Sequence, residues 1–322
     1  MPNLSEALIF AFLAASAWAW YGVAGRLEKG QPTLRSEPRA AVPWGLADLM
    51  ASLFLLSLGA AIATHWVQVH LRLPPNVPFE KWPLSARATM LLATSVASIA
   101  GLLAALAWLV LRYRIRPAEL GLQRGRLARD VAMGAITFLL ISPLVFGLQT
   151  VLTAFFESRH PLLELAKQGA DFRFFAIIIL SAVVIAPIVE EYMFRVLLQS
   201  WLERITRDAD FAALIFGGRD PVLSVEEPRD QPTGAADSLQ QPVAKGLPCP
   251  RRSSLAILVS ALVFALMHRS HGPDPIPLFL LAVALGYVFS RTGRVLPCIV
   301  AHALLNATTI ATLAISIFYG LK

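Results

Sequence analysis

The sequence predicts an all-α fold, a polytopic transmembrane helical bundle of about eight membrane-spanning helices. Hydrophobic residues make up 56% of the 322 positions and charged residues 15%, against about 45–50% and about 25% in soluble domains. The mean hydropathy is +0.62. The apolar residues gather in stretches long enough to cross a bilayer. This pattern excludes a soluble enzyme, a disordered chain and a fibrous protein.

Eight apolar stretches are expected to form these helices. They cover residues 5–25, 44–68, 88–111, 131–156, 174–202, 254–270, 276–290 and 295–319. Most reach the roughly 20 residues that a helix needs to cross a bilayer, and the sixth and seventh are shorter. None alternates as barrel strands do. The first stretch has no basic segment before it, so we expect a retained helix and not a signal peptide.

The loop charges predict the orientation of the bundle. Loops after the first, third, fifth and seventh stretches carry 19 Lys and Arg residues together, whereas the other three loops carry 7 when Arg269, at the end of the sixth stretch, is included. Because basic loops stay in the cytoplasm, both termini are expected outside and the 206–253 loop inside. The net charge of +7 then reflects the basic residues of the loops that are expected to lie in the cytoplasm. We expect the lipid bilayer as a partner and no nucleic acid.

The chain is expected to divide into two regions. Residues 1–172 form an N-terminal transmembrane region of about four helices, and residues 173–322 form a core of about four more. An insertion at 206–253 interrupts the core; it is polar and holds six prolines between Pro221 and Pro250. Such a segment cannot bury enough apolar surface to compensate for the conformational entropy that it would lose on ordering. We therefore expect a disordered, inert linker with one short helix near Phe211–Phe216. Cys249 and Cys298 lie in different environments, which argues against a disulfide.

Ionisable residues inside membrane spans are costly and indicate function. Few acids fall within the stretches, and Asp48 among them is close enough to a helix start to be interfacial. Glu190 and Glu191 lie well inside the fifth stretch, and Arg195 follows Glu191 at the spacing of an ion pair on one helical face. Pro187, just upstream, is expected to loosen or kink the helix.

Two histidines add polar groups from other helices. His268 closes the sixth stretch, with Phe264 one turn before it. His302 lies inside the eighth stretch and shares a helical face with Asn306. Together with the glutamates, these groups would suit general-base catalysis with oxyanion stabilisation. Each group also has a purely structural interpretation. Glu191 and Arg195 would form an ion pair in helix packing, and His268 would be an interfacial histidine. His302 and Asn306 would form hydrogen bonds between helices.

Three ordered motifs can be read from these residues: EEYMFR at 190–195 fits E-E-x-x-x-R, FALMH at 264–268 fits F-x-x-x-H, and HALLN at 302–306 fits H-x-x-x-N. Their order and helix placement resemble those of the CPBP family, the CAAX proteases and bacteriocin-processing enzymes often labelled Abi proteins. RPAELGL at 116–122 is similar to a segment that often precedes the family core. The resemblance covers about 173–319. The long 206–253 insertion departs from the family pattern.

The resemblance implies an intramembrane endopeptidase. In its prenyl-protein members the first motif glutamate, here Glu190, activates a water with help from His268. The third motif, His302 and Asn306, would hold the oxyanion of the tetrahedral intermediate. The remaining motif positions, which would orient or support the base, are Glu191, Arg195 and Phe264.

The sequence leaves the cofactor open. Glu190, His268 and His302 would supply a Glu/His/His set for zinc, and the family has often been named as metalloproteases. A metal-free mechanism is favoured because the H-E-x-x-H turn of zinc peptidases is missing. Asn306 also suits an oxyanion better than a metal. No G-x-S-x-G provides a serine nucleophile, and Cys298 is a poor candidate for one.

The expected substrate is a membrane-associated protein or peptide, with or without lipid modification. The family's spread suggests the cytoplasmic membrane of a prokaryote. Two other functions remain open: a non-proteolytic scaffold or immunity protein of the same family, and a proton-coupled transporter that uses Glu190, His268 and His302 as a relay. Transporters usually contain two related halves, and no such repeat is visible in this chain.

Overall fold

The structure is a computed structural model that describes residues 4–37, 42–74, 77–123, 125–156, 172–206, 211–218 and 250–319. Within these ranges every regular element is helical, which confirms the all-α class. The long helices outside the centre are α1 (Leu4–Glu28), α2 (Leu46–His70), α3 (Leu84–Tyr113), α4 (Leu127–Thr153), α10 (Pro250–Met267), α11 (Pro275–Thr292) and α12 (Leu296–Tyr319). Short 3₁₀ turns occur at η1 (Phe79–Lys81) and η4 (Arg269–His271).

A continuous central rod follows α4 in the chain. It consists of α6 (Phe172–Ile179), η2 (Leu180–Ile185), α7 (Ala186–Glu191), η3 (Tyr192–Gln199) and α8 (Ser200–Ile205), and the short α9 (Phe211–Phe216) comes next. Both η2 and η3 are π-helical. Two widened segments therefore flank the glutamate pair, a feature that hydrophobic periodicity does not reveal.

Six helices in the described residues are long and apolar enough to cross a membrane. They are Leu46–His70, Leu84–Tyr113, Leu127–Thr153, Arg173–Ile205, Pro275–Thr292 and Leu296–Ile315. The apolar part of α10, Ser254–Met267, is shorter, and α1 is not among the six. The chain is thus a multi-pass membrane protein, while the expected count of about eight spans is not confirmed.

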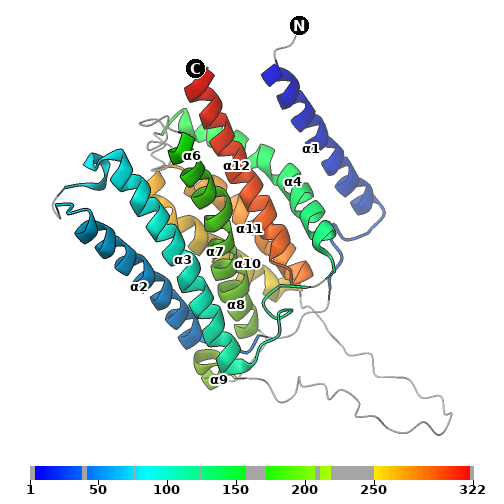
Figure 1. Cartoon of the computed structure of the whole chain (residues 1–322). Helices are drawn as coiled ribbons and strands as arrows, with labels where there is room; N and C mark the ends of the chain where they lie inside the picture. Colours follow the sequence, from blue (N-terminus) through cyan, green and yellow to red (C-terminus); the bar gives the residue numbers. More distant parts are fainter. Residues whose placement is uncertain are drawn as a thin grey trace.

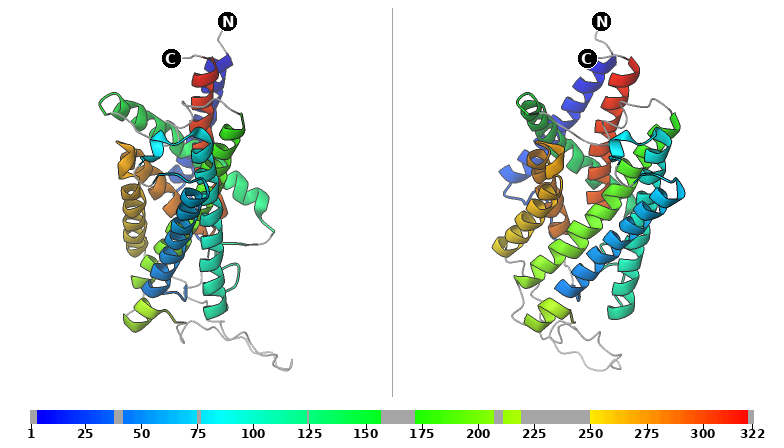
Figure 2. Two further views of the ribbon diagram at one scale, coloured as in Figure 1. Left: turned by 60° about the vertical axis from the view of Figure 1, so that its left-hand side comes forward. Right: turned by 90° about the vertical axis from the view of Figure 1, so that its left-hand side faces the viewer.

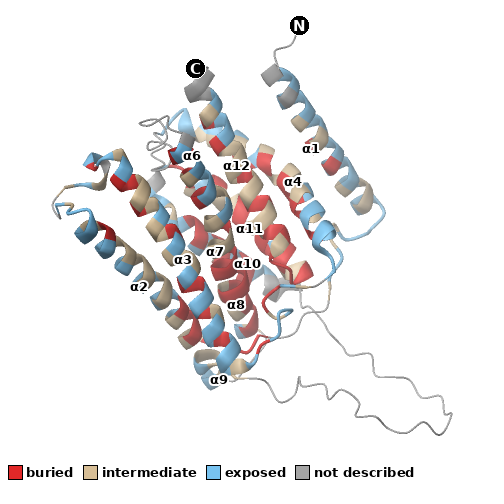
Figure 3. Ribbon diagram, in the orientation of Figure 1, coloured by how far each residue is buried: buried red, intermediate tan, exposed pale blue. Residues whose placement is uncertain are grey.

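The helices are arranged around the central rod (Figure 1). The α2–α3 hairpin lies on one side of the rod, and α1 lies at the other edge of the molecule, where it packs on α4. The start of α1 and the end of α12 lie at one end of the bundle, and α9 lies at the opposite end (Figures 1 and 2). Buried residues are concentrated around the rod, α10, α11 and α12 (Figure 3).

Close helix contacts depend on small residues, because lipid removes most of the hydrophobic drive between helices. Gly134 of α4 faces α12, and a Cβ added there would come within 2.7 Å of the Pro297 carbonyl oxygen. Gly286 of α11 faces the rod, where Gln199 Nε2 donates to its carbonyl at 2.9 Å. These contacts bring α11 and α12 against the elements that carry the motifs.

The expected disorder of the 206–253 insertion is wrong at its end, because residues 250–253 form the first turn of α10. The helix expected near Phe211–Phe216 is present as α9. Side chains of α3 and α8 donate to backbone carbonyls of α9 and of the residues just after it at 2.8 to 3.0 Å: Arg112 to Phe216, Trp201 to Leu214, and Arg204 to Gly218. Residues 207–210 and 219–249, with Cys249, lie outside the described residues, so their disorder remains a prediction.

Two buried acids are held by polar partners at helix ends. Asp48 is 1% exposed and accepts hydrogen bonds from Tyr113 at 2.6 Å and Trp108 at 3.1 Å. Asp130 pairs with Arg294, a residue that the sequence placed among the loop charges. Arg294 is itself 1% exposed and also donates to Gln123 Oε1 at 2.7 Å. The count of Lys and Arg residues in the loops did not reveal this structural role of Arg294, because it treated all basic loop residues as equivalent.

Candidate active site

Glu191 is a fully enclosed member of the motif cluster, which comprises Glu190, Glu191, Arg195, Phe264, His268, His302 and Asn306. Its side chain is fully buried, and Arg195 Nε donates to Oε2 at 2.8 Å, as the spacing of four predicted. The other oxygen, Oε1, lies 2.9 Å from His302 Nδ1. Both carboxylate oxygens are therefore engaged, one within the rod and one across to α12. Glu191 joins the first motif to the third.

Glu190 has a different environment from its neighbour. Its side chain is 28% exposed, and its Oε2 lies 3.8 Å from His302 Nε2, beyond hydrogen-bond length. It also interacts electrostatically with His268. Glu190 is thus a partly exposed carboxylate beside the His302 imidazole, which is an arrangement that suits a general base.

His268 directly follows α10 and turns back on it. Its Nδ1 lies 2.9 Å from the backbone carbonyl of Phe264. Because a carbonyl oxygen only accepts, this contact assigns the proton to Nδ1, and in the neutral ring Nε2 is left as an acceptor. The α10 backbone therefore fixes both the tautomer and the direction of this imidazole.

Phe264 is the spacer at the centre of the cluster. Its ring centroid lies 4.9 Å from that of His268 and 5.8 Å, edge to face, from that of His302. The guanidinium carbon of Arg195 lies over the same ring at 5.5 Å. Phe264 is fully buried. One aromatic ring thus sets the separation of the two imidazoles and covers the arginine.

Asn306 lies one turn beyond His302 on α12, as its spacing predicted. Its Nδ2 donates to the backbone carbonyl of Ala182 in η2 at 2.8 Å. One amide hydrogen is therefore used within the protein, and the second is the one that an oxyanion role requires. Sequence reasoning gave no sign of this contact, since Ala182 belongs to no motif.

The structure also brings in residues that the motifs did not identify. Phe194, in the variable part of the first motif, packs edge to face on Phe264 with centroids 5.0 Å apart. Ser181 of η2 hydrogen-bonds to Ser95 of α3 at 2.8 Å, next to Ala182. Small polar residues in apolar helices were the available signal, but they are too common in membrane helices to be diagnostic.

A metal-ligand group does not form in this geometry. Among the residues that the structure describes, no three His, Cys, Asp or Glu side chains lie together as they would around a metal ion. Glu190, His268 and His302 are therefore not assembled as a zinc site here, and we derive no step through a metal. Cys298 is buried, with its Sγ 3.4 Å from the Leu285 carbonyl.

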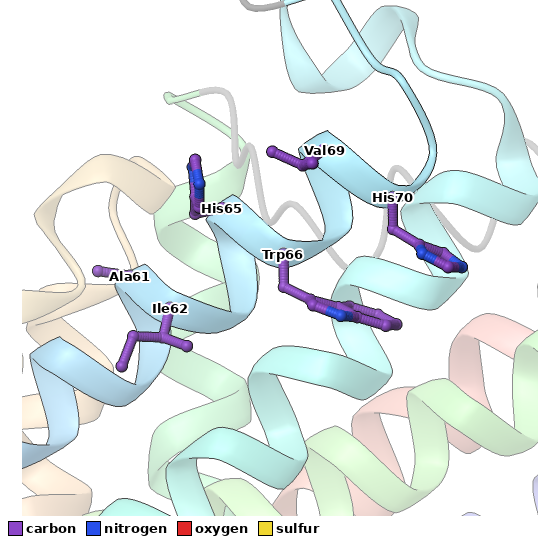
Figure 4. A pocket seen from close by; sticks show the side chains of 6 residues that line it. All are labelled: Ala61, Ile62, His65, Trp66, Val69 and His70. Carbon is purple, nitrogen blue, oxygen red and sulfur yellow. The ribbon is translucent and has the colours of Figure 1, made fainter.

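A hollow on α2 is separate from this cluster (Figure 4). All of its lining residues belong to α2: Ala61, Ile62, His65, Trp66, Val69 and His70. The rings of Trp66 and His70 stack with centroids 4.9 Å apart. Amphipathic rings near a helix end are typical of the membrane interface. The hollow contains no carboxylate and no motif residue.

Comparison with known families supports the resemblance that the motifs suggested. A family model described as type II CAAX prenyl endopeptidase Rce1-like matches residues 239–308. The matched range contains the His268 and His302–Asn306 motifs, and the Glu190 motif lies before it. Searches of curated proteins and of solved structures find no match. The resemblance expected from the motifs is confirmed at this level, and it is a resemblance to a family of proteases.

Proposed function

We propose that the protein is an intramembrane endopeptidase that hydrolyses peptide bonds of a membrane-associated protein or peptide. The observation that carries the proposal is the pair of unlike glutamates. Glu191 is buried and fully bonded, whereas Glu190 is accessible and faces His302 at 3.8 Å. Such a site inside a membrane helix places a carboxylate that can accept a proton, Glu190, beside the hydrogen bonds that hold Glu191 in position.

In the proposed reaction Glu190 takes a proton from a water that His268 Nε2 helps to hold. The resulting hydroxide attacks the scissile carbonyl carbon, and the carbonyl oxygen becomes the oxyanion of a tetrahedral intermediate. The C–N bond then breaks, and the proton on Glu190 passes to the leaving amine. Each proton and electron pair is accounted for by the water, the peptide and one carboxylate.

His302 and Asn306 are the proposed oxyanion donors. His302 donates Nδ1–H to Glu191, so in its protonated form it presents Nε2–H toward the reacting group. Asn306 contributes its second amide hydrogen. Loss of one such donor typically costs about 10²–10³-fold in kcat. Arg195 and Phe264 hold Glu191 and the imidazoles in place and do not meet the substrate.

The test is peptide cleavage by the purified full-length protein in lipid nanodiscs. Three probes separate the substrate classes: a farnesylated CAAX peptide, the same peptide without the lipid, and a bacteriocin-type leader peptide. Cleavage of at least one probe by the wild type, and of none by Glu190→Gln, would support the proposal. Equal cleavage by both proteins, or cleavage of none by the folded wild type, would refute it.

The metal-free form of the mechanism has its own test. We expect cleavage to persist after prolonged treatment with a zinc chelator, because Glu190 performs the deprotonation itself. Asn306→Ala should lower the rate without altering metal content. Stoichiometric zinc in active protein, with activity lost to the chelator and restored by zinc alone, would instead assign Glu190, His268 and His302 as ligands.

A further inference from the structure

The turn that precedes the two glutamates lacks a backbone donor at one position. In η2 the Ala186 N–H bonds to the Ser181 carbonyl, five residues back. Pro187 comes next and has no N–H. The carbonyl of Ala182 would normally be satisfied by the fourth or fifth residue after it, which are Ala186 and Pro187. Neither of them donates to it.

A side chain from another helix satisfies this carbonyl. Asn306 Nδ2 of α12 donates to Ala182 O at 2.8 Å, and Ala182 is 7% exposed. An unbonded backbone carbonyl inside a membrane is costly because no water can replace the missing donor. Asn306 thus replaces, across two helices, the hydrogen bond that Pro187 removes. The Ser95–Ser181 bond ties the same turn to α3 at 2.8 Å.

The width of this turn determines where the glutamates point. A proline ring in an α-helix clashes with the carbonyl four residues back, and the π-helical turn relieves that clash. If the turn tightened to an α-turn, residues after it would shift in register by one position, a rotation of about 100°. Such a shift would move Glu190 away from His302.

We propose that Pro187 and Asn306 act together as positioning residues that hold the η2 turn open and so set the direction of Glu190 and Glu191. Pro187 prevents the α-turn, and Asn306 satisfies the carbonyl that the wider turn leaves exposed. The catalytic consequence rests on the proposed peptidase function. The hydrogen-bond coupling does not, and it is measured separately.

A double-mutant cycle in thermal stability tests the coupling. We expect Asn306→Ala to lower the Tm of the full-length protein by about 2–4 °C. In a Pro187→Ala background the same change should cost less than about 1 °C, because a backbone N–H then serves Ala182. Thr309→Ala is the control, since the one side-chain hydrogen bond of Thr309 among the described residues stays within α12, to Leu305 O at 3.1 Å. Its effect should not depend on Pro187. Additive losses for Asn306 and Pro187 would overturn the coupling.

Turnover of the cleaved probe tests the positioning. Pro187→Ala should fold at least as stably as the wild type, yet lose on the order of 10²-fold in kcat with little change in KM, because the base is misdirected. A merely structural proline would leave kcat unchanged when the variant is stable, and that result would overturn the positioning role. A wild type that cleaves no probe would refute the proposed function, while the stability cycle would still decide the hydrogen-bond coupling.

Discussion

The two adjacent glutamates differ in role because their surroundings differ. Glu191 has no exposed surface and shares its oxygens between Arg195 and His302, while Glu190 retains 28% exposure. Arg195 depends on this pairing, since its two terminal nitrogens have no hydrogen-bond partner within the described residues. A charge buried this way is strongly destabilising when its partner is removed.

The two glutamates should therefore respond differently to the same substitution. Glu191→Gln leaves the Arg195 charge buried and unpaired, and we expect a loss of about 3–5 kcal/mol in the free energy of unfolding. Glu190→Gln breaks no short hydrogen bond and should change stability by less than about 1 kcal/mol while abolishing cleavage. Thermal unfolding of both variants measures the difference. Similar losses of stability would contradict the assigned division between base and support.

The motif residues and one contact within a helix could be predicted from the sequence, but the contacts between helices could not. The Glu191–Arg195 pair follows from helical spacing alone, and the structure contains it. The bond from His302 to Glu191 joins residues 111 positions apart, and no local pattern specifies which of the two glutamates it reaches. The Asn306–Ala182 bond depends on a π-helical turn, which hydrophobic periodicity does not detect.

At the scale of elements, hydropathy locates helices better than it describes how they pack. The expected stretch 295–319 and the observed α12, Leu296–Tyr319, nearly coincide, because a bilayer requires a long apolar run. The docking of α9 was not foreseen, since it uses backbone carbonyls as acceptors, and every sequence has those. Helix packing likewise depends on a few small residues whose partners the sequence does not name.

The α4–α12 contact should be sensitive to the size of one residue. Gly134→Ala would place a Cβ 2.7 Å from the Pro297 carbonyl oxygen and 2.6 Å from Val300 Cβ, so we expect a loss of about 1–3 kcal/mol. Gly147→Ala, in the same helix, meets nothing within 4 Å and should be neutral or slightly stabilising. Thermal unfolding of the two variants provides the comparison. Equal effects would mean that the helices do not approach closely at Gly134.

The insertion should tolerate deletion only beyond α9. Replacing residues 219–249 with a short Gly/Ser linker is expected to leave expression and Tm nearly unchanged, because its composition suggests neither core nor catalysis. Extending the deletion to residues 211–218 removes one acceptor of Arg112 and one of Arg204 and should destabilise the protein by about 1–3 kcal/mol. If both deletions were tolerated, the docking of α9 would contribute nothing measurable to the free energy of unfolding.

For the whole molecule, the arrangement of the helices and the distribution of charge agree on two distinct ends. The start of α1 and the end of α12 share one end, and α9 lies at the other (Figure 2). The basic side chains that bind α9, among them Arg112 and Arg204, belong to the loops and helix ends rich in Lys and Arg. By the positive-inside rule, the α9 end would face the cytoplasm.

Cysteine accessibility tests this orientation in cells. Cys249, in the 206–253 insertion, should resist a membrane-impermeant thiol reagent in intact cells and react once the cells are opened. Cys298 is fully buried and should add no signal. The control is Phe155→Cys in a Cys249→Ser background, because Phe155 is 76% exposed and lies just after α4, whose C-terminal end lies at the end of the bundle opposite α9 (Figure 1). Its thiol should react in intact cells. The reverse pattern, with Cys249 labelled from outside and Phe155→Cys protected, would invert the topology and place the charge-rich loops outside.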